Sequence, residues 1–337
     1  MDIEERMRLI TRNTQEIVTP EELRKLLETK KQPAIYLGTA ITGRPHVAYF
    51  LWVLKLADFL KAGFKVKVLL ADLHGALDNT PWDVLEKRYR YYEKLIPALF
   101  QAVGADVKNI EMVKGSSYQK SEAYFFDLLK LATLSSVHDA KKAGSEVVKQ
   151  SENPRLSGLL YPLMQALDEE HLQVDVQYGG ADQRKILMFA REHLPKLGYK
   201  ARVEFMTPIV PGLIGEKMSS SHEESKIDCL DAPDVVKKKL SKAFCPEGSV
   251  EGNGVMSFLK HVVFVMKEDK KESFVIERPE KYGGTVRYKA YADLEKDFIA
   301  KNVHPMDVKN ALANEINTLL EPVRKAMPEK LVRGAYP

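Results

Sequence analysis

Three polar side chains recur at helical spacing in the segment LLYPLMQALDEEH. Tyr161, Gln165 and Asp168 are four and then three residues apart, so they lie on one face of a helix. Most other residues of the segment are apolar, which predicts a buried helix. Because a buried phenol, amide and carboxylate need hydrogen-bonding partners, this spacing predicts a small polar pocket. The alternative is a helix edge with three solvated side chains.

We predict that this helix runs from 161 to 171, since Pro162 suits a first turn. Residues 174–178 are typical of a short strand, and Gly179 and Gly180 end it with a turn that lets another group approach the backbone. Asp182 is then a natural N-cap for a helix through 186–193. A helix N-terminus behind such a turn is a place where α/β sheets bind nucleotides. A capping role alone fits Asp182 equally well.

A second candidate for nucleotide binding is the loop from Gly38 to Pro45, in the segment GTAITGRPHVAYF. It follows an apolar strand at 34–37 and leads into a helix predicted to start near His46. The order of strand, loop and helix favours phosphate binding, but Arg44 and Pro45 stand where a P-loop needs Lys and Ser or Thr. A P-loop ATPase is therefore excluded. His46 alone is as consistent with capping or packing as with a phosphate contact.

The segment KMSSS supplies a lysine, Lys217, beside three hydroxyl groups in a stretch rich in glycine and serine. Such a loop can swing, and a lysine on it can meet charge that develops only in the transition state. The same composition also suits a surface linker.

The elements that must position these groups alternate. Further strands are predicted at 66–71, 110–113 and 202–206, with a long helix at 82–103, and this order favours a doubly wound, Rossmann-like parallel sheet. His74 follows the strand at 66–71, at the carboxyl end where such sheets hold ligands.

Two helical regions interrupt and follow the sheet. Residues 114–173 form a predicted helical insertion, and the chain is mainly helical beyond Asp231. We therefore expect a first domain at 1–230 with the insertion inside it, and a second, all-helical domain at 231–337. Two short polar helices are expected before residue 30.

Composition narrows the classes of function. The net charge of the 337 residues is only +4, so binding of a polyanion would need local patches of positive charge. No apolar run approaches the roughly 18 residues of a membrane span, and the N-terminal segment lacks the apolar core of a signal peptide, so we expect a cytoplasmic protein. Two cysteines are too few for a disulfide framework or a zinc site, and no tightly held metal is predicted.

Loops of the helical C-terminal region carry Tyr282, His304 and Asp307. An aromatic ring, an imidazole and a carboxylate on loops can read an unstacked base by stacking and hydrogen bonding. They are also ordinary turn residues. Lysines of the insertion, Lys142 among them, form either a solvated face or a grip on nucleic-acid phosphates.

Read together, PHVAYF at 45–50, YGGADQ at 178–183 and KMSSS at 217–221 resemble the class I aminoacyl-tRNA synthetases. The first and last correspond to that family's HIGH and KMSKS signatures. The second histidine of HIGH is Tyr49 here, and the second lysine of KMSKS is Ser220. Eukaryotic and archaeal tyrosyl-tRNA synthetases show the same departures, and the match continues through LLYPLMQALDEE, RPEKYGG and HPMDVKN. The resemblance covers nearly the whole chain.

This resemblance implies roles for individual residues. Those that would hold tyrosine are Tyr36, His74, Tyr161, Gln165, Asp168 and Gln183, with Asp168 accepting a hydrogen bond from the phenol. Those that would contact ATP are His46, Gly179, Asp182, Lys217, Met218 and Ser219, and those that would act in catalysis are His46, Lys217, Ser219 and Ser220. Those that would bind tRNA are Lys142, Arg184, Lys185, Tyr282, His304 and Asp307. ATP would arrive with Mg²⁺, without a dedicated metal site.

The implied reaction joins tyrosine to tRNA(Tyr) through a tyrosyl-adenylate, in a homodimer whose interface includes the helical insertion. Tryptophanyl-tRNA synthetases share this architecture, and an indole N–H could also donate to Asp168. A catalytically silent tRNA-binding protein with the same fold is a further alternative.

Overall fold

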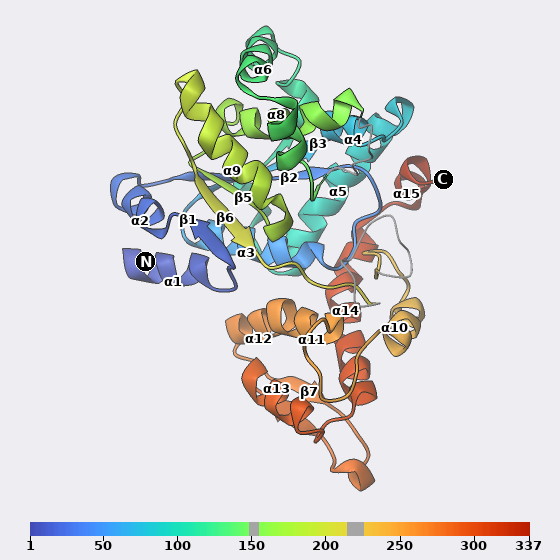
Figure 1. Ribbon diagram of the computed structural model, residues 1–337. Coiled ribbons are helices and arrows are strands. Elements are labelled where there is room, and N and C mark those ends of the chain that lie inside the picture. The colour runs from blue at the N-terminus through green and yellow to red at the C-terminus, as the bar shows by residue number, and fades with distance from the viewer. Residues whose placement is uncertain (148–154, 214–225) are drawn as a thin grey trace.

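The computed structural model describes residues 1–147, 155–213 and 226–337, and its centre is a six-stranded sheet in the order β1-β6-β5-β2-β3-β4 (Figure 1). The strands are β1 (Glu16–Val18), β2 (Ala34–Ala40), β3 (Lys65–Ala71), β4 (Ile110–Lys114), β5 (Val176–Gly180) and β6 (Val203–Thr207). All neighbours pair in parallel except β1, which runs antiparallel to β6. The prediction of a doubly wound parallel sheet is confirmed.

Alternate residues of the central strands serve two different layers. Ile35 and Leu37 of β2 belong to a core shared with the helices α3 (Tyr49–Lys61) and α5 (Leu85–Ala102). Tyr36, between them, belongs to a separate cluster and donates its hydroxyl to the carbonyl of Gln165 in α8 (Leu156–His171). Because both faces of the strand are covered, its sequence reads as a continuous apolar run.

The insertion consists of α6 (Glu122–Leu134), α7 (Val137–Ala143) and α8, as predicted for the parts of it that are described. One boundary was wrong, because α8 begins at Leu156 and Pro162 lies inside it. An internal proline costs about 3 kcal/mol and leaves the carbonyl four residues earlier without its helical partner. Burial of Leu163, Met164 and Leu167 between α8 and its neighbours offsets that cost.

The N-terminal arm holds the two expected helices, α1 (Ile3–Thr11) and α2 (Pro20–Thr29). Thr19 caps α2 by accepting from the N–H of Glu22, and Pro20 occupies the first turn, as its sequence indicates. The strand β1 between them was not predicted. Its three residues are only half-buried, which leaves no alternation to detect.

The C-terminal region is helical with one exception. Its helices are α10 (Pro233–Lys242), α11 (Gly254–Phe258), α12 (Phe264–Lys270), α13 (Tyr291–Ile299), α14 (Pro305–Ala326) and α15 (Glu329–Ala335). The strands β7 (Phe274–Ile276) and β8 (Val286–Tyr288) pair as an antiparallel hairpin, which corrects the expectation of an all-helical domain. Strands of three residues are too short to show a period of two.

Helix α15 lies apart from the other C-terminal helices and packs against α5 (Figure 1). Helix α14 packs against α5 as well, so two C-terminal helices contact a helix that belongs to the core under the sheet. None of the helices in the described ranges is both long and apolar enough to cross a lipid bilayer.

Candidate active site

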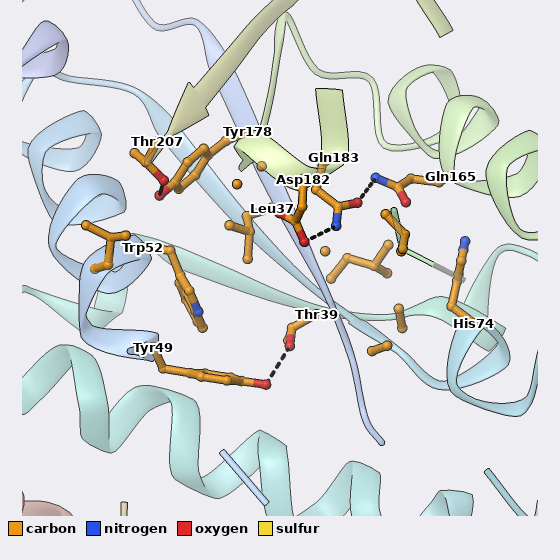
Figure 2. Close-up of a pocket in the computed structure, with 18 of the residues that line it drawn as sticks. Leu37, Thr39, Tyr49, Trp52, His74, Gln165, Tyr178, Asp182, Gln183 and Thr207 are labelled. Carbon is orange, nitrogen blue, oxygen red and sulfur yellow. Dashed lines mark hydrogen bonds between the residues drawn. The ribbon is translucent and has the colours of Figure 1, made fainter. Parts of the chain in front are cut away.

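A cavity of about 450 Å³ opens at the carboxyl ends of β2 and β5, beside α8 (Figure 2). It brings together ten residues singled out from the sequence that are otherwise up to 147 positions apart, as Tyr36 and Gln183 are. These residues are Tyr36, His46, His74, Tyr161, Gln165, Asp168, Gly179, Gly180, Asp182 and Gln183. The predicted polar face of α8 therefore lines a cavity and does not face bulk solvent.

Asp168 is fully buried at one end of this cavity, and three donors converge on its Oδ1. They are the hydroxyl of Tyr118 at 2.7 Å, Nε2 of Gln119 at 2.8 Å and the hydroxyl of Tyr124 at 2.9 Å. Its other oxygen, Oδ2, accepts no hydrogen bond from any residue that the structure describes. A buried acceptor of this kind is costly unless a ligand donates to it.

The electrostatics of this end follow from burial. Loss of solvation raises the pKa of Asp168 to about 7, although the hydrogen bonds from Gln119, Tyr118 and Tyr124 act in the opposite direction. Burial also lowers the pKa of His74 to about 4, so its imidazole is neutral at pH 7. The 3.7 Å separation between His74 Nε2 and Asp168 Oδ2 is therefore not an ion pair. A neutral, hydrogen-bonding group suits this end of the cavity better than a charged one.

Sequence reasoning missed the three donors to Asp168. Tyr118, Gln119 and Tyr124 lie 50, 49 and 44 residues before it, just before and within the first turn of α6. No local period links residues at such separations. The only available signal was indirect, since a buried carboxylate on α8 must find donors somewhere.

Along the wall of the cavity, a chain of hydrogen bonds orients the amide side chains. Gln165 Nε2 donates to Gln183 Oε1 at 3.2 Å, and Gln183 Nε2 donates to Asp182 Oδ2 at 3.4 Å (Figure 2). The hydroxyl of Tyr36 donates to the main-chain carbonyl of Gln165 at 3.2 Å, which fixes the ring of Tyr36 beside these amides. The wall thus presents oriented polar groups between the Asp168 end and the glycine turn.

Asp182 does not cap the helix that follows it, contrary to one reading of the sequence. A 3₁₀ turn over Ala181–Gln183 separates β5 from α9 (Arg184–His193), so Gln183 takes the N-cap position. The carboxylate of Asp182 instead lines the cavity. An intervening 3₁₀ turn shifts the helix start without leaving a mark in the pattern of apolar residues.

The glycine turn is required by close approach. A Cβ on Gly179 would lie 2.8 Å from Cβ of Gln183, and one on Gly180 would lie 2.6 Å from Oδ1 of Asp182. Real Cβ atoms do not approach other atoms so closely, so any larger residue would displace these cavity side chains. The prediction that the glycines admit another group close to the backbone is confirmed.

The end of β2 and the loop between β2 and α3 form the other end of the cavity, through Thr39 of the strand and Thr42 and His46 of the loop. Helix α3 begins at Tyr49 and not near His46, because His46 forms an antiparallel bridge with Asp228. The N–H of Val47 donates to the Ile227 carbonyl at 2.9 Å. His46 is buried, with its ring edge-on to Tyr49 at 5.3 Å between centroids.

The remaining residues singled out from the sequence lie away from the cavity or outside the described ranges. Lys217, Met218, Ser219 and Ser220 lie outside the described residues. Arg184 Nε is 2.7 Å from Glu16 Oε2, Lys185 Nζ is 2.8 Å from Glu146 Oε1, and Lys142 is exposed on neighbouring α7. These three residues occupy one surface region.

A second region lies in the C-terminal part of the chain. Tyr282 is exposed beside the turn at Gly283, His304 caps α14 by accepting from the N–H of Met306, and Asp307 is in the first turn of that helix. In the described ranges, no cluster of three or more His, Cys, Asp or Glu side chains has the arrangement of a metal site.

Comparison with known proteins gives consistent matches. Residues 28–321 match the family described as tRNA synthetases class I (W and Y). Over 340 residues the chain is 53% identical to the cytoplasmic tyrosine–tRNA ligase of Gallus gallus, covering 99% of this chain and 64% of that protein. Over 341 residues it is 44% identical to the tyrosine–tRNA ligase of Haloarcula marismortui, covering 100% of this chain and 98% of that protein.

A solved structure matches equally well. The crystal structure of tyrosyl-tRNA synthetase complexed with L-tyrosine from Archaeoglobus fulgidus has a TM-score of 0.90 and 42% identity, covering 97% of this chain and 100% of that one. The present chain therefore spans a whole archaeal relative but less than two thirds of the length of the Gallus gallus protein, of which it covers 64%.

Proposed function

This chain belongs to the class I tRNA synthetases of the tryptophan and tyrosine type, and from that premise we propose that it is a tyrosine–tRNA ligase. The observation that carries the choice of tyrosine is the buried Asp168, whose Oδ2 lacks a partner among the described residues while three donors fix Oδ1. A phenol hydroxyl would satisfy that oxygen. Relatives named tyrosine–tRNA ligases, at 44% and 53% identity, support the same choice.

Tyrosine would lie along α8 with its ring toward Asp168. Tyr161, Gln165 and Gln183, with Tyr36, would hold its amino group and body, and His74 would also contact it. Phenylalanine would be rejected because it leaves the buried acceptor unpaired, which costs about 1–3 kcal/mol. Tryptophan is the nearest competitor, since its indole N–H is also a donor.

ATP would occupy the other end, with its ribose near Gly179 and Asp182 and its phosphates near His46. Lys217, Met218, Ser219 and Ser220 are proposed to complete the phosphate contacts. Mg²⁺ is proposed to enter with ATP, held by phosphate and water, and it would neutralise phosphate charge.

The tyrosine carboxylate then attacks the α-phosphorus, and pyrophosphate leaves. A ribose hydroxyl of the terminal adenosine of tRNA(Tyr) next takes the tyrosyl group and releases AMP. Neither step needs a nucleophile from the protein. The residues act by holding the reactants in line and by neutralising charge that develops on the phosphates.

For the tRNA, we propose that residues 1–230 form the catalytic domain and 231–337 the anticodon-binding domain. Asp307 would contact the first anticodon base, with Tyr282 and His304 stacking nearby. Arg184, Lys185 and Lys142 would lie near the first base pair of the acceptor stem. Lys142, Arg184, Tyr282 and His304 are exposed, Lys185 and Asp307 are half-buried, and their grouping into two separate regions supports this division.

We also propose that the protein forms a homodimer through the helical insertion. We propose a cytoplasmic location, because the Gallus gallus relative is named as cytoplasmic. Support for the interface comes from apolar side chains exposed on α6 and α7. They are Phe125, Phe126, Leu129, Leu134 and Val137, from 41% to 64% exposed. Clustered apolar exposure of this kind marks protein interaction surfaces.

The test is exchange of pyrophosphate into ATP with tyrosine, tryptophan and phenylalanine assayed in parallel. The proposal expects exchange with tyrosine far above the other two. Exchange that depends on tryptophan instead would assign the sister activity. Binding of tRNA without exchange for any of the three would identify a catalytically silent relative.

A further inference from the structure

The carbonyl oxygen of Gly43, in the loop between β2 and α3, accepts hydrogen bonds from two phenols. The hydroxyl of Tyr92 lies 2.6 Å from it and the hydroxyl of Tyr336 lies 2.8 Å from it. A carbonyl oxygen has two lone pairs, so both are used. The adjacent carbonyl of Thr42 accepts from the guanidinium of Arg88. The backbone of this loop is therefore held by side chains.

Tyr336 comes from a distant part of the chain, 293 residues from Gly43. It directly follows α15, which packs on α5 (Figure 1). Its ring is fixed on two sides, by the guanidinium of Arg88 at 5.0 Å from the ring centroid and by the edge-on ring of Tyr91 at 5.2 Å. The hydroxyl therefore has a defined position from which to hold the loop.

The same loop contributes to the cavity at its other end. Thr42 and His46 of the loop, with Thr39 at the end of β2, line the part proposed for ATP. A series of hydroxyl groups connects the carbonyl of Gly43 to the cavity. The hydroxyl of Tyr92 lies 3.5 Å from the hydroxyl of Tyr49. The hydroxyl of Tyr49 in turn lies 3.2 Å from Oγ1 of Thr39 (Figure 2). A shift at Gly43 would consequently move groups that face the nucleotide.

A second connection reaches the loop from other C-terminal helices. Arg44 forms an ion pair with Asp228, Nε to Oδ2 at 3.0 Å, and the N–H of Asp228 donates to Oδ2 of Asp231 at 2.9 Å. Asp231 is in turn held by Lys239 of α10 at 2.7 Å and, through its carbonyl, by Arg324 of α14 at 2.8 Å. Tyr336 thus contacts Gly43 directly, and α10 and α14 are linked to the next loop residue, Arg44, through Asp231 and Asp228.

We propose that Tyr336 is a positioning residue for the ATP-dependent step. Its hydroxyl holds the carbonyl of Gly43 so that Thr42 and His46 keep the positions that the nucleotide requires. The helical C-terminal region thereby sets the competence of the active site for ATP as well as contacting tRNA. This inference rests on the proposed function, because it assigns ATP to this end of the cavity.

The direct test is Tyr336→Phe, which removes the hydroxyl and keeps the ring between Arg88 and Tyr91. The KM for ATP in tyrosine-dependent exchange is expected to rise about three- to tenfold, the effect of one neutral hydrogen bond. The Kd for tyrosine, measured without ATP, is expected to stay at the wild-type value, because Gly43 does not line the Asp168 end. A purely structural role would shift both constants.

Tyr288→Phe is the matched control. It also removes one hydroxyl from the C-terminal region, where Tyr288 donates to Asp297 at 2.9 Å, but this hydroxyl has no contact with the loop. Both constants are expected to remain unchanged in this variant. An ATP KM of Tyr336→Phe equal to that of Tyr288→Phe would overturn the inference, and so would an equal change in both constants.

Hydrogen exchange separates this inference from the proposed function. Amides of residues 39–47 are expected to exchange faster in Tyr336→Phe than in Tyr288→Phe, whatever the substrate. If the wild-type protein shows no tyrosine-dependent exchange of pyrophosphate into ATP, the proposed function fails. Amide protection in Tyr336→Phe that equals that of the wild-type protein would refute, independently of that result, the inference that Tyr336 holds the loop.

Discussion

The two ends of the cavity are built in different ways. At the Asp168 end, side chains hold a side chain, since Tyr118, Gln119 and Tyr124 all donate to one carboxylate oxygen. At the other end the cavity is shaped by backbone, namely the loop before α3 and the turn at Gly179 and Gly180. Substitutions at the first end should therefore change recognition of the amino acid, and those at the second should change use of ATP.

This difference follows from the chemistry of the two proposed ligands. A phenol is neutral and must be recognised by one hydrogen bond in a dry site, where a misplaced acceptor is costly. ATP is charged and extended, and the backbone can approach it closely where glycine leaves out a side chain. The backbone end then needs support from outside, which side chains distant in sequence supply.

The largest expected effect is that of Asp168→Asn. The amide removes the negative charge that a phenol hydroxyl would meet, and it changes one acceptor oxygen into a donor. A hydrogen bond to a charged group contributes about 1.5–3 kcal/mol, so kcat/KM for tyrosine should fall about 10- to 100-fold. The KM for ATP should change little. Exchange assays that vary one substrate at a time measure both values.

Asp127→Asn is a suitable control for that variant. Asp127 is also a buried carboxylate held by donors, with the hydroxyl of Tyr199 at 2.6 Å and Lys130 Nζ at 3.1 Å, but it does not line the cavity. An equal loss of kcat/KM for tyrosine in the two variants would mean that Asp168→Asn acts through a general loss of stability. The proposal that the Asp168 end recognises the amino acid would then be wrong.

A second expected effect is a pH dependence of tyrosine affinity. Because burial raises the pKa of Asp168 to about 7, the carboxyl group of the free protein is largely protonated below that pH. A phenol donates to the ionised form, so the affinity for tyrosine should fall up to tenfold for each pH unit below about 7. Titration calorimetry in buffers of different ionisation enthalpy should detect proton release of about half a proton at pH 7.

The sign for stability is opposite. A carboxyl group with a raised pKa in the folded state stabilises the free protein fully below its unfolded pKa of about 4, and that contribution is lost as the pH rises through about 7. Asp168→Asn should remove both dependences. A tyrosine affinity that is flat between pH 5.5 and 8 in the wild-type protein would contradict this prediction.

The smallest expected effect is that of Gly180→Ala. The added methyl group would lie 2.6 Å from Oδ1 of Asp182, which is the flexible end of a side chain and can turn away without unfolding the site. We expect the KM for ATP to rise about fivefold, corresponding to one weakened hydrogen bond, with tyrosine affinity unchanged. Gly334→Ala, where a Cβ meets no atom within 4 Å, is the control. A loss of tyrosine affinity in Gly180→Ala would show that the two ends are not independent.

Much of the fold is predictable because its signals are local. Apolar runs at 66–71 and 110–113 indicate buried parallel strands, and the polar face of α8 follows from spacing alone. The predicted ends of helices were wrong where a contact with another element outweighs the local preference of the sequence. Pro162 lies inside α8 because packing offsets its cost, and α3 starts late because His46 forms a bridge with the distant Asp228.

The residues of the candidate site also differ in whether a local pattern reveals them. Residues that face the cavity from one element, such as Tyr161, Gln165 and Asp168, have a period that can be read from the sequence. Residues that support them from another element do not. Tyr118 before α6 and Tyr336 after α15 meet their partners only once the chain has folded, and no local pattern records those meetings.

The most direct test of the account is the structure of the protein bound to L-tyrosine. We predict that the phenol oxygen lies about 3 Å from Oδ2 of Asp168, within hydrogen-bonding distance, while Tyr118, Gln119 and Tyr124 keep their bonds to Oδ1. A tyrosine ring that points toward His46, or one that leaves Oδ2 of Asp168 without a partner, would contradict it.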